Sequence, residues 1–284
     1  MSGNSSSAVR RGRCATAPEC LQKQPLIVCI RLKPSFLERF HGDWDPLERK
    51  ERELLALANA QATALTDRES RTAAMIVQVV ETLVEAGLHN MEITMDTPGV
   101  EWALMYLHAK LRERVLLGAG TVLRLEQLQQ AIVCGCRFAM SPVFVPDVTN
   151  RLIEYAEQHE VLFIPGAATP SECVQVATAL GDGKPVKVFP ADVVGGLRFV
   201  RAMAGPLGHI PLIPTSGITF DVVQEYLEAA NVYAVGVSQQ ILPAQQISAG
   251  DWSRIHELAR LWCRAVEPYA RHDSNCFSSP GINA

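Results

Sequence analysis

The sequence predicts an α/β protein that folds as a single (β/α)8 TIM barrel, with a helical insertion after the first strand. Short apolar runs alternate with amphipathic stretches along most of the 284 residues, which is the rhythm of a strand–helix repeat. An open dinucleotide-binding sheet would want a Gly-x-Gly-x-x-Gly turn after the first run, and none follows Arg31. With 48% hydrophobic residues, the chain also has enough apolar side chains for a sizeable core.

Each predicted element has a local reason. The strands are short apolar runs, and several helices begin at a capping threonine or an early proline, as at Thr97-Pro98 and Thr169-Pro170. The predicted strands span residues 26–31, 90–95, 115–118, 138–141, 162–165, 186–189, 211–215 and 232–237. The predicted helices span residues 71–86, 98–113, 124–134, 147–159, 170–180, 195–204 and 219–229.

Three segments fall outside this repeat. Residues 1–24 are rich in Ser and Arg, hold one acidic residue, and are expected to be a flexible tail; their composition also resembles an organellar transit peptide. Residues 268–284 are expected to be a second flexible tail, which leaves 25–267 as the barrel domain. Residues 32–70 form the insertion, with a helix near 46–65, where a loop of about two to six residues would be usual. It is either a lid over the active-site face or a peripheral, subunit-contact decoration.

The net charge limits the kinds of partner that the protein can bind, and the cysteines indicate its compartment. The net charge of −4 gives no basic surface for nucleic acid or for an anionic membrane, and no apolar run approaches the ~18 residues of a membrane helix. A small-molecule partner is therefore expected. The eight cysteines are scattered rather than paired in a disulfide framework, which indicates a reducing compartment such as the cytoplasm, or an organelle if the tail is a transit peptide.

One lysine has the position of a catalytic amine. Of six lysines, four lie in the predicted tail, insertion or helix surface, and Lys184 lies in a turn. Lys187 interrupts an apolar strand, and alternation places it opposite Val186 and Val188, so it should point into the barrel. Burial disfavours the charged ammonium, and a neutral amine can condense with a ketone. The alternative is a lysine whose stem packs in the strand and whose amine pairs with a carboxylate.

Two other strands supply charged side chains for the same interior. Glu92 shares a strand face with Thr94, so it is predicted to be an interior carboxylate that shuttles protons near Lys187 or serves only as a structural counter-ion. Arg31 ends the first strand and could bind a carboxylate group through its fork. The residues 215–218 and 236–238 follow strands seven and eight, whose loops commonly bind phosphate in these barrels.

Seven short blocks then carry a resemblance to the 2-keto-3-deoxy-6-phosphogluconate/4-hydroxy-2-oxoglutarate aldolases. They occur in the family's order between about residues 26 and 242, with the insertion omitted. The blocks are Glu92-Ile93-Thr94, Gly118-Ala119-Gly120-Thr121-Val122, Ser141-Pro142, Ile164-Pro165-Gly166, Lys187-Val188-Phe189-Pro190-Ala191, Gly205-Pro206 and Pro214-Thr215-Ser216-Gly217-Ile218.

The resemblance implies a role for each matching residue. Lys187 would be the Schiff-base lysine and Glu92 the general acid/base. Arg31 and Thr121 would hold the pyruvyl carboxylate, Pro142 and Phe189 would line the pyruvyl pocket, and the phosphate would bind to Ser216, Gly217 and Ser238.

Two positions differ from the family pattern. Asp96 stands where some members carry an arginine, and members without that arginine end strand one with a pair such as Ile30-Arg31. Carboxylate binding is therefore assigned to Arg31. Ser216-Gly217 replaces the usual Gly-Gly of the seventh loop.

The resemblance implies a lyase that needs no metal or other cofactor and assembles as a homotrimer. Its reaction splits a 2-keto-3-deoxy acid into pyruvate and an aldehyde, which is glyceraldehyde 3-phosphate or glyoxylate according to the substrate. Two alternatives remain open. One is another lyase on the same site, such as an oxaloacetate decarboxylase, and the other is a catalytically silent barrel that binds a phosphate or a keto acid.

Overall fold

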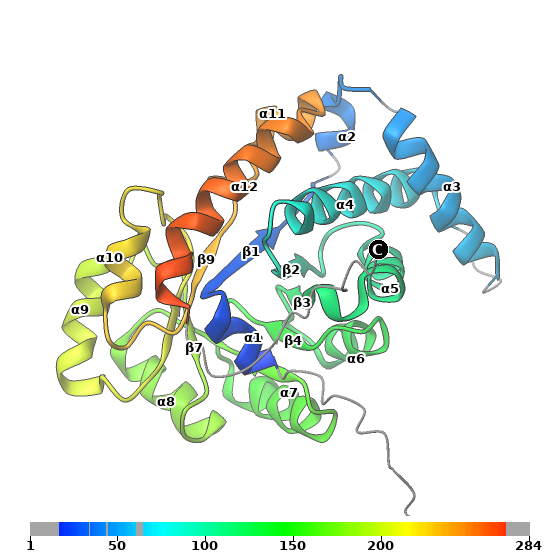
Figure 1. Ribbon diagram of the computed structural model, residues 1–284. Helices are drawn as coiled ribbons and strands as arrows, with labels where there is room; N and C mark the ends of the chain where they lie inside the picture. Colours follow the sequence, from blue (N-terminus) through cyan, green and yellow to red (C-terminus); the bar gives the residue numbers. More distant parts are fainter. Residues whose placement is uncertain (1–16, 34, 44, 61–64, 271–284) are drawn as a thin grey trace, which may run out of the picture.

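The computed structural model describes residues 17–33, 35–43, 45–60 and 65–270, and most of the two predicted tails lies outside these ranges. Parallel strands form a curled sheet, and helices surround it on the outside (Figure 1). The strands are β1 Leu26–Ile30, β2 Asn90–Thr94, β3 Leu116–Gly120, β4 Phe138–Met140, β5 Leu162–Ile164, β6 Gly166–Ala167, β7 Val186–Val188, β8 Leu212–Pro214 and β9 Val235–Val237. Every predicted strand overlaps one of these.

The strands divide into two parallel sheets at a proline. One sheet has the order β5-β4-β3-β2-β1-β9 and the other the order β6-β7-β8. Pro165 separates β5 from β6, and the predicted strand at 162–165 is split there because proline has no N–H for a ladder bond. The Pro165 carbonyl still accepts a hydrogen bond from the Lys187 N–H at 2.9 Å, so pairing continues past the break.

The helices follow the predicted order, with differences at several ends. They are α1 Ala17–Lys23, α2 Ser35–Arg39, α3 Asp45–Ala60, α4 Asp67–Glu85, α5 Val100–Leu111, α6 Leu125–Val133, α7 Pro146–Gln158, α8 Pro170–Leu180, α9 Gly196–Leu207, α10 Val223–Glu228, α11 Ala244–Ala249 and α12 Trp252–Val266, with 3-10 turns at Arg112–Arg114 and Glu267–Tyr269. The pattern predicted no helix after residue 229, yet α12 buries Ile255 and Trp262.

Helix α4 begins earlier than predicted, which moves the end of the inserted segment from residue 70 to residue 66. Thr66 accepts a hydrogen bond from the Glu69 N–H, and the Glu69 carboxylate accepts one from the Thr66 N–H. This reciprocal capping box satisfies two backbone donors of the first turn. The Thr-x-x-Glu spacing was a sequence signal that the prediction did not use.

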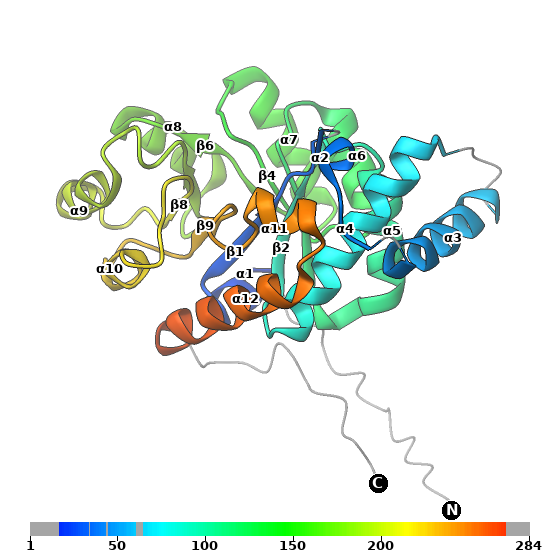
Figure 2. The ribbon, with the colours of Figure 1, turned by 90° about the horizontal axis from the view of Figure 1, so that it is seen from above.

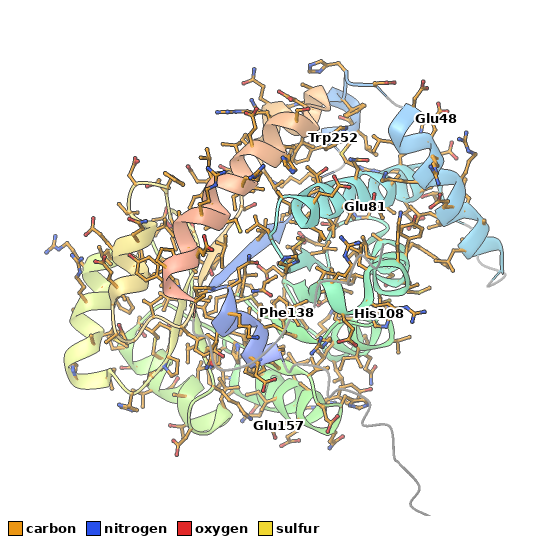
Figure 3. The ribbon with its side chains drawn as sticks, viewed as in Figure 1. Glu48, Glu81, His108, Phe138, Glu157 and Trp252 are labelled. Carbon is orange, nitrogen blue, oxygen red and sulfur yellow. The ribbon has the colours of Figure 1, made fainter. Side chains whose placement is uncertain are left out.

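Helix α1 corrects the predicted N-terminal boundary. The flexible tail was expected to run to residue 24, but residues 17–23 are helical and bury Ala17, Cys20 and Leu21. This spacing, at i, i+3 and i+4, gives one apolar helix face. That face packs against apolar side chains from the amino ends of the strands, among them Phe138, which lies beside α1 in Figure 3. The folded unit therefore begins by residue 17.

The two helices between β1 and α4 lie in different places. Helix α3 packs on α4 and α5 at the outer edge of the molecule (Figure 2). Glu81 of α4, labelled in Figure 3, pairs with Lys50 of α3 at 3.1 Å and with Lys110 of α5 at 2.7 Å. Helix α2 instead lies beside α11 (Figure 1). The interpretation of the insertion as a peripheral decoration thus fits α3, whereas α2 lies against a different part of the fold.

A membrane-spanning segment was not expected, and none of the helices in the described ranges combines the length and apolarity needed to cross a bilayer.

Removing the apolar face of α1 should destabilise the fold. Leu21 is fully buried, so Leu21→Ala should lower the free energy of unfolding by about 2–5 kcal/mol, as measured by urea denaturation. The control is Leu261→Ala on α12, which deletes the same atoms from a side chain that is 45% exposed and should cost about 0.5 kcal/mol or less. Equal losses in the two variants would mean that α1 contributes no packing to the core.

Candidate active site

A cavity of about 1060 Å³ opens at the carboxyl ends of the strands. Its walls come from the ends of most strands, from the loops after them, and from the segment after β1. All nine residues predicted for the site line this one cavity: Arg31, Glu92, Thr121, Pro142, Lys187, Phe189, Ser216, Gly217 and Ser238. Parallel strands bring their carboxyl ends to the same edge, which is why residues far apart in the sequence meet here.

Lys187 and Glu92 form a buried ion pair inside the cavity. Lys187 pairs with Gly166 on one side and with Ile213 on the other, so the strand register places its side chain on the inner face, as alternation predicted. Its Nζ lies 3.3 Å from Glu92 Oε1, and the two side chains are only 7% and 3% exposed. The same Nζ lies 5.6 Å from the centre of the Phe189 ring. An amine and a carboxylate this close can exchange a proton directly.

A glycine on the neighbouring strand leaves space for the Glu92 carboxylate. On this strand, β3, a Cβ atom at Gly120 would lie 2.8 Å from Glu92 Oε2. Oε2 is buried, and no residue in the described part of the chain donates a conventional hydrogen bond to it. One carboxylate oxygen of Glu92 therefore faces Lys187, while the other is buried without such a donor.

Cys29 is a lining residue that the sequence analysis did not select. It pairs with Glu92 across β1 and β2 and shares the cavity with Lys187. Burial is the main reason that its pKa is raised well above the usual thiol range, and the negative charge of Glu92 raises this pKa further. The Cys29 side chain is therefore a neutral thiol near pH 7.

Arg31 lies at the rim, and two neighbours orient its guanidinium. Its Nη2 donates a hydrogen bond of 2.6 Å to Thr121 Oγ1, and its Nε lies 3.6 Å from Asp96 Oδ1. Asp96, the departure from the family pattern, thus pairs with the residue to which carboxylate binding was assigned. Both side chains are about half exposed, so this ion pair contributes more to orientation than to stability.

The loops after β8 and β9 also line the cavity, and a bridge between Thr215 and Gly236 brings their starting points together. Ser216 and Gly217 have φ angles of 88° and 69°, a left-handed pair that turns the chain sharply. A Cβ at Gly217 would lie 2.2 Å from Asp192 Cβ, so glycine is needed for this close approach. Ser238 follows β9 in the neighbouring loop. The two loops thus present small and hydroxyl-bearing residues to one end of the cavity.

The segment after β1 adds lining residues that were not predicted for the site. They are Lys33, Ser35, Phe36, Arg39 and His41. Alternation could not have found them because they lie outside any strand. Within the described ranges, no three His, Cys, Asp or Glu side chains are close enough together to share a metal ion.

Comparison with known proteins agrees with this arrangement. A family model described as KDPG and KHG aldolase matches residues 61–258. The chain belongs to this aldolase family. It is 37% identical over 190 residues to a 2-dehydro-3-deoxy-phosphogluconate aldolase of Treponema pallidum, covering 67% of this chain and 87% of the relative. It is 34% identical over 185 residues to the KHG/KDPG aldolase of Escherichia coli, covering 65% and 83% of the two chains.

Solved structures place the fold in the same family. A KDPG aldolase from Legionella pneumophila, with pyruvate captured as a covalent carbinolamine intermediate, superposes with a TM-score of 0.65 at 27% identity and covers 86% of this chain and 97% of its own. An aldolase of Zymomonas mobilis at 24% identity has a TM-score of 0.63, covers 92% of this chain and 100% of its own, and supports the fold. The predicted family and the α/β fold are thereby confirmed.

The raised pKa of Cys29 predicts slow alkylation. A higher pKa leaves less thiolate at a given pH, so iodoacetamide at pH 8 should modify Cys29 at least about tenfold more slowly in the folded protein than in urea. Peptide mass spectrometry measures both rates. The rate in the folded protein should still rise through pH 9–10 without a plateau, because the thiol is still ionising there. If restricted access alone slowed the reaction, the rate would level off at the usual thiol pKa. A plateau below pH 9 would contradict the raised pKa.

Proposed function

We propose that the chain is a class I aldolase that uses Lys187 as its Schiff-base lysine. The observation that carries the proposal is the buried contact of 3.3 Å between Lys187 Nζ and Glu92 Oε1 at the floor of the cavity. The covalent carbinolamine of the Legionella relative is a product of an amine and pyruvate, which supports the same chemistry here. The substrates would be 2-keto-3-deoxy-6-phosphogluconate, 4-hydroxy-2-oxoglutarate or both, as the names of the relatives suggest.

The reaction begins when Glu92 takes a proton from the Lys187 ammonium of the buried ion pair, and the resulting neutral amine attacks C2 of the keto acid. A second proton passes from the nitrogen to the C2 oxygen to give the carbinolamine, and Glu92 then returns its own proton to this hydroxyl, which leaves as water and yields a protonated imine. The imine then accepts the electron pair of the C3–C4 bond, while Glu92 removes the C4 hydroxyl proton and the aldehyde departs. Protonation of the enamine at C3 and hydrolysis release pyruvate and restore the lysine.

The remaining predicted residues would hold the substrate. Arg31 and Thr121, already hydrogen-bonded to each other, would bind the carboxylate next to C2. Pro142 and Phe189 would line the pyruvyl pocket. At the far end, Ser216, Gly217 and Ser238 would bind the phosphate through hydroxyl and backbone donors.

The two sheets together would make one closed barrel. In this proposal β5 and β6 count as a single strand, which gives eight, and the domain starts with α1. Isolated bridges between Leu212 and Val232 and between Thr215 and Gly236 support closure between β8 and β9.

The assembly would be a homotrimer. Exposed valines follow β4, at Val143, Val145 and Val148, and are of the kind that a subunit contact would cover.

The free thiols of the six described cysteines support a reducing compartment such as the cytoplasm.

Trapping with pyruvate tests the lysine. Borohydride should reduce the imine and fix a pyruvyl group on Lys187, visible by intact mass and peptide mapping. Lys187→Ala should lose both the adduct and the cleavage of substrate, because Lys187 is the lysine that contacts Glu92. The matched control is Lys184→Ala, which removes an exposed lysine paired with Glu157 and should keep both. No adduct on the unmodified protein at saturating pyruvate would favour a silent barrel and overturn the proposal.

Replacing the carboxylate tests the proton shuttle. Glu92→Gln keeps a hydrogen-bonding partner for Lys187 but cannot accept a proton, so kcat for aldol cleavage should fall by about 10²–10⁴. Steady-state kinetics with each candidate acid measures the effect, and the melting temperature checks that the variant folds. An unchanged kcat in a folded variant would show that Glu92 is only a structural counter-ion.

A further inference from the structure

The segment between β1 and α3 forms a wall of the cavity that carries positive charge. The charged residues are Lys33 and Arg39, which line the same cavity as Lys187. Ser35 and Arg39 lie one turn apart on α2, which places both on the same face of the helix, and both line the cavity. The seven sequence blocks that carry the family resemblance include none of these residues.

This wall is attached to the loop region after β9. The His41 N–H donates a hydrogen bond of 2.8 Å to the Ser248 carbonyl of α11. At the next residue, Gly42, a Cβ would lie 2.6 Å from the Ala249 carbonyl oxygen, so the two backbones run in direct contact. Phe36 and Phe40 pack against the main hydrophobic core. The position of α2 is therefore set by contacts with backbone and core.

The attachment places the positive charge near the proposed phosphate site. Strand β1 pairs with β9, and the chain passes from β9 through Ser238 to α11, the helix on which the α2 segment is docked. Ser238 is one of the residues proposed to bind the phosphate. Arg39 and Ser238 thus belong to two adjacent segments of one cavity wall.

The charges on this wall lack acidic partners. Lys187 pairs with Glu92, and Arg31 pairs with Asp96. In the described part of the chain, neither Lys33 nor Arg39 forms an ion pair. Glu92 and Asp192 are the acidic residues among those that line the cavity. This end of the cavity therefore has an excess of positive charge that suits an anion.

We propose that Arg39, with Lys33, binds the terminal phosphate of the substrate and makes the enzyme selective for phosphorylated 2-keto-3-deoxy acids. This inference rests on the proposed aldolase function. In 2-keto-3-deoxy-6-phosphogluconate the phosphate is on C6, whereas 4-hydroxy-2-oxoglutarate ends in a carboxylate at C5. The longer acid carries more negative charge and carries it farther from C2. A guanidinium on the cavity wall that adjoins the proposed phosphate site therefore favours the phosphorylated acid.

Steady-state kinetics on the full chain tests the selectivity. For Arg39→Gln, the ratio of kcat/KM for the phosphorylated acid to that for 4-hydroxy-2-oxoglutarate should fall by about tenfold to a hundredfold, mostly through KM. Lys33→Gln combined with Arg39→Gln should lower the ratio further. The control is Arg151→Gln, an exposed position on α7 outside the cavity lining, which should leave the ratio unchanged. An unchanged ratio in the Arg39 variants would overturn the proposal.

A second measurement separates this proposal from the aldolase assignment. Inorganic phosphate should bind the unmodified protein in calorimetry, and Arg39→Gln should weaken that binding by a similar factor, whether or not catalysis occurs. Pyruvate trapping by borohydride involves no phosphate and should be unaffected by Arg39→Gln. If the unmodified protein forms no pyruvyl adduct, the aldolase function is refuted. If the unmodified protein and the Arg39→Gln variant bind phosphate equally well, only the role of Arg39 is refuted.

Discussion

The buried contact between Lys187 and Glu92 is the interaction on which the site depends. Removing an ammonium and a carboxylate from water is costly, and their mutual attraction offsets that cost only when the geometry is good. Strand pairing supplies the geometry, because Glu92 is fixed by its neighbours on β1 and β3 and Lys187 by its neighbours on β6 and β8. Two residues that lie 95 positions apart thereby approach within 3.3 Å, and both belong to strands rather than to loops.

The inner face of the curled sheet changes character along the strands. Near the amino ends it carries apolar side chains such as Leu116 and Phe138, and helix α1 packs against them. Near the carboxyl ends it carries polar residues and glycines. The glycines are needed for space, since a Cβ at Gly118 would lie 2.3 Å from the Phe138 ring and one at Gly120 would approach Glu92. The apolar end supplies stability, and the open end provides room for chemistry.

The long segment after β1 has two parts with different roles. Helix α3 is fixed to the outside of the fold by the pairing of Glu81 with Lys50 and Lys110, and by a hydrogen bond from Tyr106 to Glu53. Helix α2 reaches the cavity because His41 and Gly42 contact α11. One segment thus contains both a peripheral helix and a wall of the cavity.

The sequence by itself determined where the strands lie along the chain, the inward direction of Lys187 and Glu92, and the family. Alternation along a strand is a local property with a period of two, so it needs no knowledge of distant segments. The tertiary structure alone decided that α1 covers the amino end, that Asp96 pairs with Arg31, and that Lys33 and Arg39 line the cavity. These features depend on packing between segments far apart in the chain, such as His41 against Ser248, and no local pattern encodes such contacts.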